Sequence, residues 1–177
     1  MGADDRVDLS LGDLRSVADF ALQTAQDVLE IFERAHPEDR RPREAIEAAR
    51  AFALGAKRGK ILRDTALAAL RAANEVESDA AAQAARAAML AASAAYLHPL
   101  AKATQVKHIL GAPAHAARAL ELESGDHQAG TDYLKRCVDR ISPAVVDVLL
   151  RYPPAPSGGG RVGELLRLLD SELRKAG

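Results

Sequence analysis

The side chains of this chain that could do chemistry are five histidines and one cysteine. His108 and His115 lie seven residues apart. On a helix this spacing puts both on one face but separates them by about 10 Å along the axis, too far to share a metal ion directly. No His-x-x-x-His pair occurs, the spacing that places two imidazoles on adjacent turns. We therefore expect neither a metal site nor a cofactor.

Other sites stay open or are disfavoured by their context. His98, His108 and His115 could surround a pocket for a small molecule or a metal ion, and this is kept as an alternative function. Cys137 could act as a nucleophile only beside a histidine, and in a helix it is more typical of a small core residue. The segment "GGGRVG", residues 158–163, matches Gly-x-Gly-x-x-Gly, but prolines precede it where a dinucleotide fingerprint needs a strand. No catalytic residues are expected.

The composition favours helices as the elements that position these groups. Alanine, the best helix former, makes up about a fifth of the chain, tryptophan is absent, and aromatic residues are 3%. β-branched and aromatic residues, which favour strands, are scarce. The sequence predicts an all-α fold, a single-domain helical bundle of seven or eight helices. Small side chains let helices approach closely, so the core should be thin.

Helix boundaries follow from capping residues, prolines and glycines. Ser10 with Asp13 resembles a capping box, Pro42 suits a first helical position, and Pro113 is expected to kink its helix. The predicted helices span about residues 11–35, 42–53, 60–75, 79–97, 104–122 and 128–140, a short helix opened by Ser142-Pro143, and 162–175. In the third, Ile61, Leu62, Ala66, Leu67 and Leu70 are expected to form the apolar stripe.

The chain divides into three parts by composition. We expect an alanine-rich bundle over residues 1–152, a Pro/Gly linker over 153–160 around "YPPAPSGGG", and a C-terminal helix over 161–177. That helix could dock on the bundle or on a neighbouring subunit, so a homodimer stays open.

The charge balance excludes some partners. There are 24 Lys and Arg against 25 Asp and Glu, a net charge of -1, so no overall field attracts nucleic acid or an anionic membrane. Every apolar run is interrupted by charges before it is long enough to cross a membrane. A single cysteine and no secretory leader indicate a cytoplasmic protein.

The segment "HPEDRRPREAIEAARAF", residues 36–52, concentrates charge where a helix begins. We expect Arg41 to cap this helix, with Glu44 reaching back to the Arg41 backbone N–H. Glu47 should pair with Arg43 and Arg50 on the solvent face. Ile46, with Ala49 and Phe52, should face inward. Arg40 and Arg41 are then left over, for structural pairing with nearby carboxylates or for an anionic partner.

A second basic cluster, Lys57, Arg58, Lys60 and Arg63, raises the question of nucleic-acid binding. If the second and third helices form an antiparallel hairpin, the two clusters lie at opposite ends and do not merge. Few aromatic residues are present for base stacking. We expect no nucleic acid as partner, whereas a basic rim that faces an acidic protein stays reasonable.

Two segments carry a family resemblance. "DRRPREAIEAARAFALG" resembles the helix-two signature Asp-x-Arg-Pro-Arg-x-Ala-Ile-Glu-Ala-x-Arg-Ala-Trp of an all-helical family of bacterial putative immunity proteins from polymorphic toxin systems. "AKATQVKHILGAPAHAARALEL" is similar to a later helix of that family. Phe52 replaces the usual tryptophan, and Thr104 stands where the family has a further histidine. The matching positions are Asp39, Arg41, Pro42, Arg43, Ala45, Ile46, Glu47, Arg50, His108 and Gly111.

The resemblance implies an inhibitor that binds and neutralises a cognate bacterial toxin, a protein partner, without catalysis. Steering toward such a partner comes from exposed charge. We therefore predict that the partner-binding residues are Asp39, Arg40, Arg41 and Arg43.

Overall fold

The computed structural model describes residues 5–177, and over this range it is all helical, with eight α-helices, two short 3-10 turns and no β-strand. This confirms the predicted all-α, single-domain fold. The helices are α1 (Leu11–Ala35), α2 (Arg41–Ala53), α3 (Lys60–Glu75), α4 (Asp79–Ser93), α5 (Val106–Ser124), α6 (His127–Arg140), α7 (Pro143–Leu150) and α8 (Gly160–Ala176).

Local capping chemistry sets several helix starts. The Ser10 hydroxyl accepts the Asp13 backbone N–H at 3.0 Å, and the Asp13 carboxylate accepts the Ser10 N–H at 2.9 Å, which is the predicted capping box. The side chains of Ser78 and Ser142 likewise accept backbone N–H groups at the starts of α4 and α7. Each cap satisfies donors that a helix start leaves unpaired. These short-range patterns are the reason that the predicted boundaries lie within a few residues of the observed ones.

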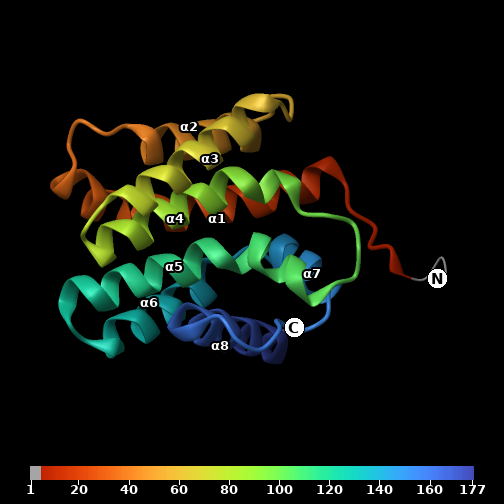
Figure 1. Ribbon diagram of the computed structural model, residues 1–177. Coiled ribbons are helices and arrows are strands. Elements are labelled where there is room, and N and C mark those ends of the chain that lie inside the picture. Colours follow the sequence, from red (N-terminus) through yellow and green to blue (C-terminus); the bar gives the residue numbers. More distant parts are fainter. Residues whose placement is uncertain (1–4) are drawn as a thin grey trace.

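The α4 helix lies at the centre of the bundle and packs against α1, α2, α3 and α5. Figure 1 shows α2 and α3 on one side of α1 and α4, and α5 with α6, α7 and α8 on the other. Nine α4 residues are buried, and all but one are alanine. Because alanine projects only a methyl group, neighbouring helices approach α4 closely on several sides.

Gly111 lies at a close contact between α4 and α5. A Cβ atom at this position would lie 2.7 Å from Leu90 Cδ1, so only glycine fits without displacing that leucine. Pro113 follows two residues later, and α5 continues through it to Ser124. The α5 helix therefore carries two unusual residues where it crosses the central helix.

The α8 helix packs on α5 and α6. Its buried side chains are Leu165, Leu169, Leu173 and Asp170. The preceding segment is held to it, since Asp170 accepts the Ala155 N–H at 2.9 Å and Arg167 donates to the Gly158 carbonyl at 2.6 Å.

The apolar stripe predicted for α3 is partly wrong. Leu62 and Ala66 are buried, but Ile61 is 60% exposed and Leu67 is 49% exposed. The α3 helix packs mainly against α2 and α4, so its inward face is narrow and is filled by Leu62, Ala69 and neighbouring small residues. Helical spacing alone therefore predicted more buried apolar residues than the inward face of α3 can hold.

Candidate functional site

The residues at the start of α2 are held by carboxylates from three parts of the chain. Arg41 Nη2 lies 2.7 Å from Asp39 Oδ2 and 2.6 Å from Glu75 Oε2 at the end of α3. Arg43 Nε lies 2.6 Å from Glu33 Oε1 on α1. We call Asp39, Arg40, Arg41 and Arg43 the α2 start.

Several predicted details of the α2 start are wrong. The helix begins at Arg41, and the Arg41 N–H bonds the Asp39 carboxylate at 3.1 Å instead of Glu44. Arg43 pairs with Glu33, and Arg50 donates to Gln26 at 3.3 Å, so neither forms the expected pair with Glu47. Asp39 lies two residues before Arg41, and its short side chain accepts the Arg41 backbone N–H. That N–H is then not available to Glu44.

The pKa values reflect this pairing. Hydrogen bonds from Arg41 hold the pKa of the Asp39 carboxyl below its ordinary value, against the opposing effect of burial. Hydrogen bonds to Asp39 and Glu75 raise the pKa of Arg41 above its ordinary value. The expected surplus of arginine is therefore neutralised largely by other helices. Arg40 is the exception, since its side chain is 62% exposed and its Nη2 lies 3.7 Å from Glu47 Oε1.

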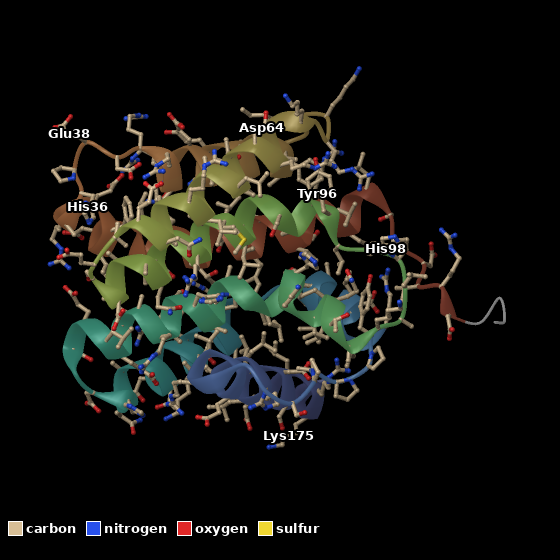
Figure 2. The ribbon with its side chains drawn as sticks, in the orientation of Figure 1. His36, Glu38, Asp64, Tyr96, His98 and Lys175 are labelled. Carbon is tan, nitrogen blue, oxygen red and sulfur yellow. The ribbon has the colours of Figure 1, made fainter. Side chains whose placement is uncertain are left out.

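The two basic clusters lie at opposite ends of the α2–α3 hairpin. The Arg41–Glu75 bridge ties the start of α2 to the end of α3, so the helices run antiparallel. In Figure 2, Glu38, just before α2, lies at the far left of the molecule, and Asp64, in the first turns of α3, lies well to its right along the same edge. The cluster at the start of α2 and the cluster of Lys57, Arg58, Lys60 and Arg63 are therefore separated by the length of the hairpin. This is the separation that an antiparallel hairpin predicts.

A groove of 750 Å³ lies between α4, α5 and the start of α8. Gln83, Leu90 and Ser93 of α4 line one wall, and His108 and His115 of α5 line the facing wall. Cationic side chains at its rim come from all three helices and are Arg86, Lys107, Arg118 and Arg161. No carboxylate is among its lining residues.

Both groove histidines are neutral near pH 7. Burial, followed by repulsion from Lys107, lowers the pKa of His108 to about 4. Burial, followed by repulsion from Arg86, lowers the pKa of His115 to about 4. His115 Nδ1 is 2.5 Å from Gln83 Oε1, whereas His108 Nδ1 is buried without a hydrogen-bond partner in residues 5–177.

His98 does not join the other two histidines. It is exposed in the segment between α4 and α5, and its carbonyl accepts the Tyr152 hydroxyl at 2.9 Å. Figure 2 shows it near the N-terminal end of the described chain. The three-histidine pocket is therefore reduced to His108 and His115. Within residues 5–177, no group of three or more His, Cys, Asp or Glu side chains could hold a metal ion.

Glu121 is the charged residue that sequence reasoning missed. Its side chain is fully buried, and its carboxylate accepts Arg161 at 2.6 Å and Arg118 at 3.0 Å. Arg161 thereby ties the start of α8 to α5 beside the groove. A sequence signal was present, because Glu121 follows Ala114 and Ala117 at helical spacing on the buried face of α5.

Cys137 is buried beside a partly exposed polar cluster that joins α1 and α6. The Tyr133 hydroxyl donates to Asp27 at 2.7 Å, and Arg140 pairs with the same carboxylate. Burial raises the pKa of the Cys137 thiol above its ordinary value, so the reactive thiolate is disfavoured. These contacts fasten α6 to α1 and leave Cys137 as a core residue.

Comparison with known proteins places the chain in a family. The family model described as "Imm-5 like putative immunity protein" matches residues 9–144, which span α1 to the start of α7 and include both the α2 start and the groove histidines. No match was found among curated proteins or among solved structures. Among the described residues, no helix is long and apolar enough to cross a membrane. Since the match covers most of the chain, the protein belongs to the Imm-5 like putative immunity protein family.

Proposed function

We propose that this protein binds and neutralises a cognate bacterial toxin in the cytoplasm without catalysing a reaction. The family match over residues 9–144 carries the proposal. The histidines and the cysteine are consistent with it. His108 and His115 are neutral and about two helical turns apart, and Cys137 is buried with a raised pKa. Inhibition then depends on a surface that plugs or distorts the toxin.

The α2 start is the first surface that we propose for this contact. Its salt bridges fix the arginine side chains in a charged ridge, and Arg40 is exposed enough to exchange Glu47 for a carboxylate of the partner. Arg41 and Arg43, by contrast, already use their guanidinium groups within the chain. We therefore expect Arg40 to contribute most to binding and Arg41 to contribute to stability as well.

The test is co-purification with the product of the neighbouring gene and neutralisation of its toxicity. Arg40→Ala should weaken binding and its dependence on salt, and leave the melting temperature unchanged. Arg34→Ala is the matched control, because Arg34 is also an exposed arginine with one carboxylate partner, Glu123. If Arg40→Ala and Arg41→Ala lower stability without lowering affinity, the α2 start belongs to the scaffold.

The groove supports a second candidate function, the binding of a small anionic molecule. Arg118 and Arg161 in its lining already pair with Glu121, but Arg86 and Lys107 make no ion pair within residues 5–177. The buried His108 Nδ1 also has no partner in the described chain. Titration with inorganic phosphate, followed through the ring nitrogens of His108 and His115, tests this function. Unchanged ring signals at millimolar phosphate would remove it.

A further inference from the structure

Large apolar side chains are exposed together where α1 begins, α2 ends and α3 begins. Leu54 is 82% exposed, Ile61 60% and Leu11 47%. Single exposed leucines are ordinary on a protein surface, but a group of them at one end indicates a contact surface. We call this region the α2–α3 corner, formed by residues 54–63 with Leu11 and Arg15.

Contacts across the α2–α3 corner join its parts into one surface. Arg15 of α1 donates to the carbonyl groups of Phe52 at 3.2 Å and Gly55 at 3.1 Å. Beside this contact lies a groove of 520 Å³ with an apolar wall that includes Leu11 and Leu97. Arg15, Lys57 and Arg58 also line it, and no carboxylate of residues 5–177 does.

Four cations of the corner differ from those at the α2 start, because they lack carboxylate partners among the described residues. Within residues 5–177, no ion pair to a carboxylate within 4.0 Å is made by Arg15, Lys57, Arg58 or Arg63. Arg58 donates to the Ala95 carbonyl at 3.2 Å, and both Arg58 and Arg63 stack over the Tyr96 ring. The one ion pair here joins the largely exposed Lys60 to Asp64 at 3.5 Å.

The backbone of the corner is held in place before any partner arrives. The Tyr96 hydroxyl donates to the Gly59 carbonyl at 3.1 Å, and Arg15 holds the Gly55 carbonyl from the other side. Figure 2 shows Tyr96 below this loop and well away from Glu38. A pre-formed surface loses little conformational entropy on binding, which favours affinity.

We propose that the α2–α3 corner docks an acidic segment of a protein partner that also presents apolar side chains. Leu54 and Ile61 would be covered by the apolar side chains, and the unpaired cations would meet carboxylates. The inference rests on the proposed function in taking that partner to be the toxin. Phosphate chains of nucleic acid would leave the exposed leucines uncovered. A symmetric dimer through this face would bring Lys57 and Arg58 against their own copies.

The first experiment uses two synthetic peptides with the same leucines, one with glutamates and one with lysines between them. Each is titrated into the isotopically labelled full chain and followed by backbone amide signals. The glutamate peptide should shift amides at Leu11, Leu54 and Ile61, and the lysine peptide should not. Shifts scattered over other surfaces, or equal shifts with both peptides, would overturn the inference.

Charge reversal supplies the matched variants. Lys57→Glu with Lys60→Glu should weaken binding of the glutamate peptide by about tenfold, because two attractive contacts become repulsive. Lys135→Glu with Lys175→Glu makes the same change of net charge at exposed lysines of α6 and α8 and should bind like wild type. Leu54→Ser should weaken binding without changing its salt dependence. Equal affinities of the two charge-reversal variants would refute the assignment.

The neighbouring toxin then separates this inference from the proposed function. If wild type neutralises the toxin and the Lys57→Glu, Lys60→Glu variant does so equally well, the corner is not the docking surface and the function stands. If wild type does not bind the toxin, the function fails and the peptide result still decides the corner. A single-stranded DNA that shifts the corner amides more than the glutamate peptide, or a dimer that Leu54→Ser dissociates, would also overturn the inference.

Discussion

Replacing Glu121 by glutamine should loosen the attachment of α8 to the bundle. The side chain keeps its shape but loses the negative charge that accepts Arg161 at 2.6 Å and Arg118 at 3.0 Å. Removing one partner of a buried ion pair costs about 3–5 kcal/mol. Because Arg161 is 27% exposed and can turn toward water, we expect about 2–3 kcal/mol for Glu121→Gln.

The assay is urea unfolding followed by the helical circular dichroism signal. With a slope of about 2 kcal/mol/M, the loss corresponds to a midpoint lowered by about 1–1.5 M. Glu164 gives a matched control, since it also accepts Arg161, at 3.1 Å, but is 60% exposed. Glu164→Gln should cost less than about 0.5 kcal/mol, as exposed pairs do.

A double-mutant cycle with Arg161→Gln isolates the interaction. The coupling free energy between Glu121 and Arg161 should exceed about 1.5 kcal/mol. Burial opposes ionisation of Glu121, but hydrogen bonds from Arg161 and Arg118 outweigh it and hold the pKa of Glu121 below its ordinary value. Its stabilising contribution is therefore present above the unfolded pKa and is lost as pH falls through the folded pKa. A coupling below about 0.5 kcal/mol would refute the role assigned to this pair.

Two further predictions concern the core and the groove. Ile46→Asp should prevent folding, because it buries an unpaired charge at a position 2% exposed, whereas Ile61→Asp, at a position 60% exposed, should melt like wild type. Equal melting of the two variants would show that the face of α2 is misassigned. Stability to urea should fall as pH is lowered from 6.5 to about 4, since unfolded His108 and His115 bind protons that the folded state excludes. A variant with asparagine at both positions should show a smaller loss of stability over this pH range. An equally large loss would contradict the conclusion that His108 and His115 are neutral in the folded protein.

The helices could be predicted from the sequence because their signals are local. Ser10 with Asp13, and Ser142 before Pro143, fix helix starts within a few residues of chain, and α1 and α7 begin where these residues predict. The inward face of α2 could also be predicted, since Ile46 and the charged residues around it recur at helical spacing. Such signals depend on the backbone of one helix and not on its neighbours.

The charged contacts could not be predicted because their partners are distant in sequence. Arg43 had a glutamate four residues away, yet it pairs with Glu33 of α1, and Arg41 reaches Glu75 of α3. Helical spacing could place Glu121 on the buried face of α5, but it could not name Arg161, forty residues later, as its partner. Which carboxylate an arginine meets is decided by how helices pack, and helical spacing gives only the candidates on one helix.

The alanine-rich centre explains why the functional proposals all concern the surface. A buried methyl group can pack but cannot donate, accept or titrate. The polar side chains that α4 contributes to the groove are Gln83, Arg86 and Ser93. Close helix packing also leaves little space between the central helices. Polar function is thereby displaced to places where helices end or diverge, which are the α2 start, the groove at α8 and the α2–α3 corner. Of these, the corner combines exposed apolar side chains with cations that lack carboxylate partners in the described chain. A protein partner can cover the apolar side chains and pair with the cations at the same time, whereas solvent cannot cover the apolar side chains.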